Sequence, residues 1–190
     1  MNYGLSYIIS LRQTVQNNIP RMLQNWLKIE TYHHSQHEGV VQLLTATMHE
    51  EFEIWLDPAI VKDIEVEHDQ FWVALADQRV IGTIGLKLAN PIGVVRKMCV
   101  HRNFRGPQFG IAFQLLAALE WECKRRTIGD IYLGTRSVFK AACRFYEKAG
   151  YTEVTLNHLP KEFPMMSTDD RFYMKRLSCE RALHQSDCCL

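Results

Sequence analysis

The 190-residue chain has 47% hydrophobic and 23% charged residues, a balance that predicts one globular domain and excludes a largely disordered protein. The formal net charge is +1, and neither an aromatic-studded basic face nor a nucleic-acid-binding motif is present, so no nucleic-acid partner is expected. No run of residues approaches the ~18 apolar positions that a membrane span needs, so no membrane partner is expected either.

Charge is unevenly distributed along the chain. Residues 96–150 carry eleven Lys or Arg against four Asp or Glu, a balance of +7. Residues 30–77 carry eleven acidic residues against one basic residue, a balance of −10. Either a charged ligand bridges these two regions, or both are solvated helix faces.

The cysteines and histidines predict no metal site. No CxxC pair is present, and the histidine cluster at 33–37 lacks an HExxH pattern. Three cysteines lie in apolar periodic segments and three lie near the end of the chain (Cys99, Cys123 and Cys143; Cys179, Cys188 and Cys189). Buried, reduced thiols and the lack of a recognisable leader predict a cytoplasmic protein.

The first part of the chain predicts an appendage, a strand and two helices. Residues 1–27 carry no recognisable chemistry, and Lys28–Tyr32 has the pattern of a strand. Ser35 with Glu38 has the spacing of a capping box. The helix that they open has an apolar stripe made of Val41, Leu44, Met48 and Phe52. Asp57-Pro58 predicts the start of a short second helix.

Three strands are predicted next, over residues 71–76, 80–88 and 94–100, with a hairpin turn at 77–78. Simple alternation in the third strand divides its side chains between two faces. One face would carry Val94, Arg96, Met98 and Val100, and the other Val95, Lys97 and Cys99.

The second half predicts helices alternating with strands. A loop at 102–108 leads into a helix with the stripe Ala112, Leu115, Leu116, Leu119 and Cys123. After a strand at 131–133, a second helix carries Val138, Ala141, Ala142, Phe145 and Ala149 on one face and ends at Gly150. Strands at 151–154 and 171–175 finish the domain.

This order, β-α-α-β-β-β-α-β-α-β-β, predicts an α/β (α+β) fold with a mixed, mostly antiparallel sheet and helices on both faces. The domain is expected to span residues 28–177, followed by a tail over 178–190.

The segment 105–116, RGPQFGIAFQLL, is the strongest candidate for binding a ligand. It joins a strand to a helix, its glycines let the backbone approach a ligand, and the first turn of the helix offers free N–H groups to an anion. Pyrophosphate is the natural occupant, and a plain turn is the alternative. The segment is neither a Walker A loop nor a GxGxxG fingerprint.

Two motifs resemble those of the GNAT acetyltransferase superfamily. RGPQFGIAFQLL resembles its coenzyme A-binding motif, Arg/Gln-x-x-Gly-x-Gly/Ala, with two residues inserted after Arg105-Gly106. FKAACRFYEKAGY resembles its second motif, Asn-x-x-Ala-x-x-x-Tyr-x-x-x-Gly-Phe, with Phe139 in place of the Asn. The role of that Asn would fall to Thr135 or Ser137, or be absent. The segments GTIGL and LPKEFPMM…DDRFY also resemble a bacterial branch, so the resemblance covers roughly residues 28–176.

The resemblance implies direct transfer of acetyl from acetyl-coenzyme A to a primary amine, without a metal. A backbone N–H of Met98–Val100 would polarise the thioester carbonyl, and Tyr146 would protonate the departing sulfur as general acid. The implied coenzyme A contacts are Met98, Cys99, Val100, Arg105, Gly106, Gln108, Phe109, Gly110, Ile111, Ala112, Lys140 and Ala142. Arg105, Lys140 and Arg144 are candidates to neutralise its phosphates, or are plain surface residues.

The proton acceptor is not fixed by the sequence. Glu50 and Glu51 are the candidates retained, from an acidic group that also includes Glu53 and Asp57, and a water relay is the alternative. This acidic group predicts a small cationic acceptor such as a polyamine, an amino sugar or a basic side chain. A non-catalytic coenzyme A-binding sensor or partner module, transfer of a longer acyl chain, and a homodimer all remain open.

Overall fold

The computed structural model describes residues 27–56 and 68–178. Seven strands in these ranges form one sheet in the order β1-β2-β3-β4-β5-β7-β6. They are β1 (Leu27–Thr31), β2 (Gln70–Ala76), β3 (Arg79–Ala89), β4 (Ile92–Val100), β5 (Asp130–Thr135), β6 (Thr152–Val154) and β7 (Arg171–Arg176). Every neighbouring pair is antiparallel except β4 and β5, which confirms the predicted mixed, mostly antiparallel sheet.

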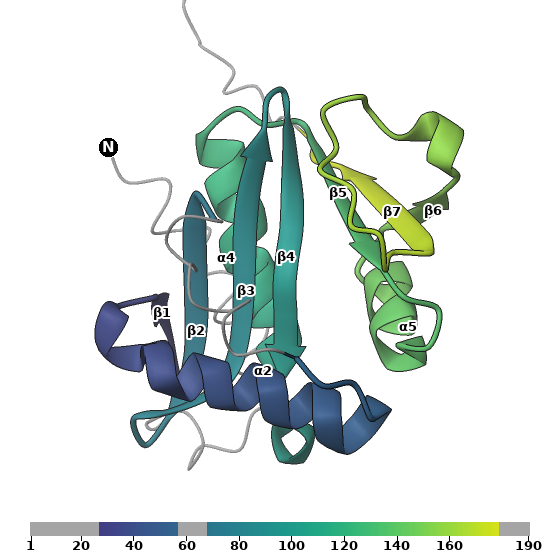
Figure 1. The fold of residues 1–190 in the computed structure, drawn as a ribbon. Coiled ribbons are helices and arrows are strands. Elements are labelled where there is room, and N and C mark those ends of the chain that lie inside the picture. Colours follow the sequence, from purple (N-terminus) through teal and green to yellow (C-terminus); the bar gives the residue numbers. More distant parts are fainter. Residues whose placement is uncertain (1–26, 57–67, 179–190) are drawn as a thin grey trace, which may run out of the picture.

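Helices cover both faces of the sheet, as predicted. Helix α2 (His37–Phe52) crosses the front in Figure 1, and α4 (Ile111–Arg125) lies behind. Helix α5 (Lys140–Lys148) follows β5 and packs into the same core cluster as α4. Short 3₁₀ turns are η2 (His34–Gln36), η4 (Arg102–Phe104) and η5 (Leu156–His158). The predicted appendage lies outside the described residues except for Leu27, as do the predicted second helix and all of the tail but Ser178.

The largest core cluster lies between the sheet and α4. The predicted stripe of α4 is confirmed, since Leu115, Leu116, Leu119 and Cys123 are all buried and Ala112 is half-buried. These side chains meet inward-facing residues of the central strands, such as Ile84, Val95 and Leu133. The predicted hairpin turn between β2 and β3 is also confirmed, because Asp77 and Gln78 both have the left-handed backbone that a two-residue hairpin requires.

The predicted stripe of α2 is wrong by about one position. Leu44 is buried as predicted, but the other buried residues are Val40, Leu43 and Thr47, whereas Val41, Met48 and Phe52 are half-buried. Thr47 takes an inward position because its hydroxyl has a buried partner, the Cys99 thiol at 3.5 Å. The predicted capping box of Ser35 and Glu38 is also replaced. The chain enters through η2, where the Gln36 side chain accepts a hydrogen bond from the His33 amide at 2.8 Å.

The predicted face of α5 needs a similar correction. The helix begins at Lys140, so Val138 lies before it and is 48% exposed. Its buried residues are Cys143 and Tyr146, while Ala141 faces solvent. The other three predicted positions, Ala142, Phe145 and Ala149, are half-buried and flank this stripe. Gly150 follows the helix with φ of 85°, which confirms its predicted role at the C′ position.

A separate apolar cluster covers the front face of β4, β5 and β7. It contains Ile92, Val94, Tyr132, Phe163 and Phe172. These strand residues face the α2 side, because they alternate with neighbours that face α4. The cover is the segment 155–170 between β6 and β7, anchored by the Phe163 side chain. The sequence analysis did not predict this cover.

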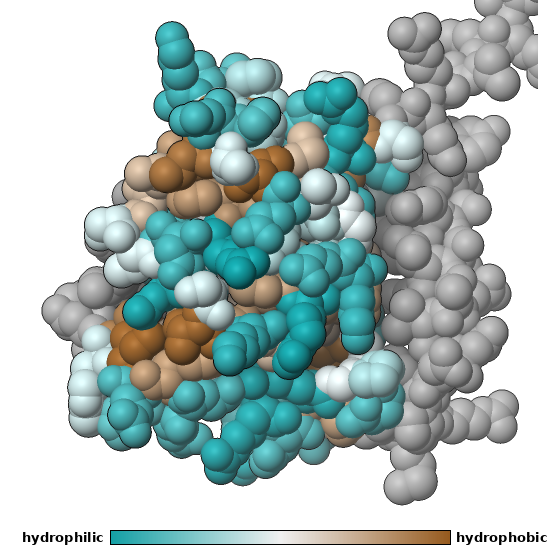
Figure 2. All heavy atoms as spheres, turned by 90° about the vertical axis from the view of Figure 1, so that its right-hand side faces the viewer, coloured by the Kyte–Doolittle hydropathy of each residue, from teal (hydrophilic) through white to brown (hydrophobic). Residues whose placement is uncertain are grey.

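Figure 2 looks onto the right-hand side of Figure 1, which carries β6, β7 and α5. Apolar side chains gather there in two patches, with polar side chains between them. The apolar surface of the described residues in this view is therefore divided. A homodimer remains a prediction.

The three cysteines expected in the core are buried and free. Burial raises the pKa of the Cys123 thiol to about 12, so this side chain stays protonated near neutral pH.

We expect Leu115→Ala to destabilise the fold by about 2–5 kcal/mol, because Leu115 is fully buried and its truncation leaves a cavity. The matched control is Leu156→Ala, at a side chain 57% exposed, which should change stability by less than about 0.5 kcal/mol. Urea unfolding of both variants checks this. Equal losses in the two variants would contradict the assignment of the core.

Candidate functional site

The strands β4 and β5 separate soon after they meet. They pair only at Gly93–Ile131 and Val94–Tyr132, although each continues beside its other neighbour. Figure 1 shows the two strands diverging below this contact. Past Val94, no strand of residues 27–56 or 68–178 pairs with the edge of β4 that faces β5. An extended ligand can pair with such an edge as an added strand does.

A bulge in β4 lies within this opening. Between the pairs Gly85–Arg96 and Thr83–Cys99, β4 carries one residue more than β3. Lys97, in the bulge, has a left-handed φ of 48°. Its carbonyl accepts a hydrogen bond of 2.7 Å from the buried Thr83 hydroxyl, which fixes the distortion. Bulges of this kind redirect the side chains that follow them.

The bulge overturns the predicted alternation of β4. The prediction put Val100 with Val94 on one face and Val95 with Cys99 on the other. In the structure Val95 and Val100 both join the core beneath α4, whereas Cys99 joins the cluster beneath α2. The extra residue shifts the two-residue period, so every position after Lys97 changes face. Met98, a predicted ligand contact, is half-buried against the α4 core.

The loop after β4 presents the start of α4 to the opening. Gly106 and Gly110 both have positive φ, 108° and 61°, and Gly110 is the residue before the helix. The amides of Phe109 and Gly110 donate to the Gly106 carbonyl at 3.2 Å. The next amides, of Ile111 and Ala112, belong to the first helical turn and have no intrahelical acceptor. Together with the amide of Phe113, which also precedes the first intrahelical donor, Gln114, these are the amides that the helix start offers to an anion.

Gln108, one of the two inserted residues, is exposed and stabilises this loop by a local hydrogen bond. Its side-chain amide donates to the Arg105 carbonyl at 3.1 Å. The loop needs glycine at position 106 for its positive φ of 108°.

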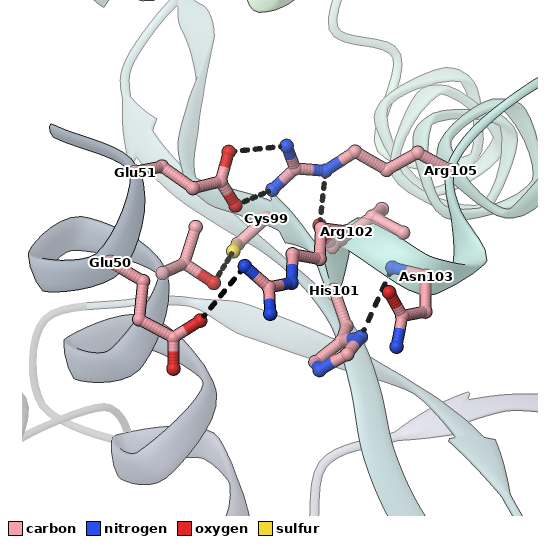
Figure 3. Close-up of polar contacts among 9 residues, drawn as sticks. Glu50, Glu51, Cys99, His101, Arg102, Asn103 and Arg105 are labelled. Atoms are coloured by element: carbon pink, nitrogen blue, oxygen red, sulfur yellow. Dashed lines mark hydrogen bonds and ion pairs between the residues drawn. The ribbon is translucent and has the colours of Figure 1, made fainter.

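Arg105 joins three parts of the site (Figure 3). Its Nε donates to the Val100 carbonyl at 2.6 Å, and its two terminal nitrogens donate to the two carboxylate oxygens of Glu51 at 2.6 and 2.7 Å. The end of β4, the loop and α2 are thereby tied together by one bidentate pair. The sequence analysis proposed Arg105 as a phosphate contact and Glu51 as a base. In the structure these two side chains bind each other.

Glu50 is held more loosely. Its carboxylate lies 3.6 Å from Arg102, and both side chains are more than half exposed. An exposed pair of this length contributes little to stability. Glu50 is therefore the freer of the two predicted carboxylates.

Tyr146 is buried on the inner face of α5, with 5% of its surface exposed. Burial raises the pKa of its phenol well above the usual value, and the nearby thiols of Cys143 and Cys99 add to this. The side chain therefore stays neutral and able to donate a proton at physiological pH. Ala142, one turn earlier, is half-buried, and Lys140 at the helix start is exposed.

Phe139, which departs from the second motif, has a packing role. Its ring centroid lies 4.4 Å from that of Phe52, the last residue of α2. The two residues considered as substitutes for the missing Asn are occupied or enclosed. Ser137 binds the carboxylate of Asp170, and Thr135 is buried in β5.

The comparison with family models gives a match to the acetyltransferase (GNAT) family over residues 29–151. The chain belongs to the GNAT acetyltransferase family. The predicted family, fold and enzyme class are thereby confirmed. No curated protein sequence matches the chain.

Solved structures of GNAT enzymes share this fold. An acetyltransferase of the family from Staphylococcus aureus Mu50 is 32% identical, with a TM-score of 0.73, over 80% of this chain and 99% of that one. An acetyltransferase from Streptococcus agalactiae is 23% identical, with a TM-score of 0.75, over 80% and 99%. The PaiA N-acetyltransferase of Thermoplasma acidophilum, solved in complex with coenzyme A, is 15% identical, with a TM-score of 0.62, over 80% and 99%.

A hollow that the sequence analysis missed lies where α2 of this GNAT domain ends beside η4. It has a volume of about 810 Å³ and is lined by His49, Glu50, Glu53, Trp55 and Arg102. Trp55 is 82% exposed, and its ring centroid lies 4.0 Å from that of His49. The signal available in the sequence was a tryptophan close behind the acidic residues Glu50, Glu51 and Glu53. Asp57 lies outside the described residues.

The histidine cluster at 33–37 has structural contacts. The hydroxyl of Tyr32 lies 3.1 Å from His37 Nδ1, and the rings of His34 and His37 stack with centroids 5.8 Å apart. Within residues 27–56 and 68–178, no group of three or more His, Cys, Asp or Glu side chains is arranged to hold a metal ion. No helix in the same ranges is long and apolar enough to cross a membrane.

Breaking the Arg105 pair should destabilise the domain, since the guanidinium would lose two charge-assisted hydrogen bonds at a half-buried position. We expect Glu51→Ala to cost about 1–3 kcal/mol of unfolding free energy. Glu50→Ala, at the adjacent exposed pair, should cost less than about 1 kcal/mol. Denaturant unfolding at low and high salt measures both variants. A larger loss of unfolding free energy for Glu50→Ala than for Glu51→Ala would contradict the structural role of the Arg105–Glu51 pair.

Proposed function

We propose that this GNAT enzyme transfers acetyl directly from acetyl-coenzyme A to a primary amine. The observation that supports this most is the opening between β4 and β5, which lies directly before the glycine loop and the first turn of α4. An extended arm with a pyrophosphate at one end matches both features. The thioester would then lie beside the bulge of β4.

Different parts of the site bind different parts of coenzyme A. The amides of Ile111 and Ala112 face the pyrophosphate, because the amides of Phe109 and Gly110 already donate to Gly106. The pantetheine arm pairs with the free edge of β4. Lys140, exposed at the start of α5, supplies positive charge, with Ala142 offering a small side chain on the same helix. Arg105 and Gln108 act by holding the loop in shape.

The reaction needs a hydrogen-bond donor that stabilises the oxyanion and an acid that protonates the leaving thiolate. As the amine attacks, the thioester carbonyl becomes an oxyanion, which a backbone N–H of Met98–Val100 stabilises. When the carbon–sulfur bond breaks, Tyr146 gives its proton to the thiolate of coenzyme A. Its raised pKa keeps the phenol protonated until that step.

The acceptor proposed is a small cation. The hollow at the end of α2 combines the exposed face of Trp55 with the carboxylates of Glu50 and Glu53. An aromatic face and carboxylates attract ammonium groups. Glu50 has only its long, exposed contact with Arg102 to give up when it meets the amine, whereas Glu51 would first have to leave its bidentate pair with Arg105.

Turnover with a panel of amines tests this function. We expect acetylation of polyamines, amino sugars or basic amino acids, and none of neutral or acidic amino compounds. Tyr146→Phe should lower kcat by about 10²–10⁴-fold, because the leaving thiolate loses its acid, and should leave acetyl-coenzyme A affinity unchanged by calorimetry. Activity on anionic acceptors alone would refute the substrate class. Tight coenzyme A binding without turnover would instead identify a non-catalytic binding module.

A further inference from the structure

The side chain of Asp169 lies in the opening between β4 and β5, on the face opposite α4. Its carboxylate packs directly against Gly134 of β5, where a Cβ would collide with Oδ2. On the β4 side, Arg96 Nη1 lies 3.8 Å from the same oxygen. The amide of Asp170 donates to the Thr135 carbonyl at 3.0 Å, which holds the chain at the end of β5. Asp169 therefore spans the gap where the two strands have parted.

One oxygen of this carboxylate, Oδ2, lacks the hydrogen bond that a structural aspartate usually has. The Asp169 side chain is 7% exposed, and Oδ2 has no hydrogen-bond partner among the described residues. The adjacent Asp170 is a direct contrast. Both of its oxygens are bound by Ser137, at 2.6 Å from the amide and 2.7 Å from the hydroxyl, which lowers its pKa. A buried oxygen without a donor is costly, so its retention suggests use by a ligand.

Solvent reaches the neighbourhood of this group through a hollow. Asp169 lines a space of about 470 Å³ where β6 and β7 diverge, together with Thr155, Asp170 and Phe172. The other charged residues there, Glu153 and Arg171, are paired with each other at 2.9 Å.

Arg96 holds the cover of this site in place. Its guanidinium donates to the Pro164 carbonyl and lies 5.8 Å from the centre of the Phe163 ring. The segment 155–170 is thus fastened to β4 beside Asp169. Arg96 is a positioning residue, because it fixes both the cover and the carboxylate.

We propose that Asp169 is the general base of the transfer reaction, taking the proton of the acceptor's ammonium group in the gap between β4 and β5. This inference rests on the proposed function, and it leaves Glu50 with the role of attracting the cation. The sequence analysis quoted Asp169 only within the segment DDRFY and assigned it no role.

The protons balance as follows. Asp169 takes one proton from the ammonium, and the neutral amine then forms a bond to the thioester carbon. The carbon–sulfur bond breaks, and the thiolate takes the proton of Tyr146. The second proton of the nitrogen restores the Tyr146 phenol, and Asp169 releases its proton to solvent. The net products are the acetylated amine, the free thiol of coenzyme A and one proton.

The environment of Asp169 suits a base. Burial raises its pKa, and Arg96 and the Met166 amide oppose that rise, while Asp170 adds to it. A raised pKa brings a carboxylate closer to the pH at which it both accepts and releases a proton. Because the ionised form is the active one, kcat should fall as pH drops through this pKa.

The test compares Asp169→Asn with wild type and with the matched control Asp170→Asn, using an amine that the wild type acetylates. We expect Asp169→Asn to lower kcat by about 10²–10⁴-fold and to abolish the acidic limb of the kcat–pH profile. Its affinity for acetyl-coenzyme A and its melting temperature should stay near wild type. Asp170→Asn should keep the acidic limb, whatever its effect on stability.

A second variant covers the case in which Asp169→Asn does not fold. Arg96→Gln removes the cation that lowers the pKa of Asp169, so the acidic limb should move to higher pH. An unchanged acidic limb in both variants, or wild-type kcat in Asp169→Asn, would overturn the proposal and leave the acetyltransferase function intact. A wild type that acetylates no amine would overturn both.

Discussion

The site depends on the separation of β4 and β5 after only two paired positions. A parallel pair that continued to the ends of its strands would leave no backbone edge for a ligand. The opening exists because each strand keeps a different partner: β4 remains with β3, and β5 remains with β7. The bulge at Lys97, fixed by the Thr83 hydroxyl, lies in the same stretch of β4. The candidate active site of this GNAT domain is thus a defined break in an otherwise continuous sheet.

Side chains from distant parts of the chain stabilise the two sides of this break. On one side, Arg105 ties the glycine loop to β4 and to Glu51 of α2. On the other, Arg96 ties the cover segment to β4 through Pro164 and Phe163. Both arginines use a planar guanidinium to join backbone and side-chain groups, which a lysine could not reproduce. The basic balance of residues 96–150 therefore serves internal contacts as well as any ligand.

Much of the fold followed from local patterns, because those patterns record what each element buries. The stripe of α4 and the turn at Asp77-Gln78 are read directly from spacing and turn chemistry. The predictions were wrong where tertiary contacts determine which side chains of an element are buried. Thr47 faces inward because Cys99 lies opposite, and the phase of β4 shifts because one extra residue is accommodated at Lys97. Neither partner is visible from a single segment.

The site residues likewise fall into those that the sequence indicated and those that only the fold brings together. The glycine loop and Tyr146 lie in recognisable motifs, so the sequence indicated them. The pairing of Arg105 with Glu51 joins residues 54 positions apart, and the contact of Asp169 with Gly134 joins the segment before β7 to β5 by packing alone. Trp55 and Phe163 are likewise ordinary residues in the sequence, and only the fold shows what surrounds them.

A crystal structure with coenzyme A tests the central claim most directly. The account predicts pyrophosphate oxygens within about 2.7–3.2 Å of the Ile111 and Ala112 amides. It also predicts that the pantetheine arm lies along β4 between Val95 and Cys99. A coenzyme A molecule bound elsewhere, with β4 and β5 still open and empty, would contradict it.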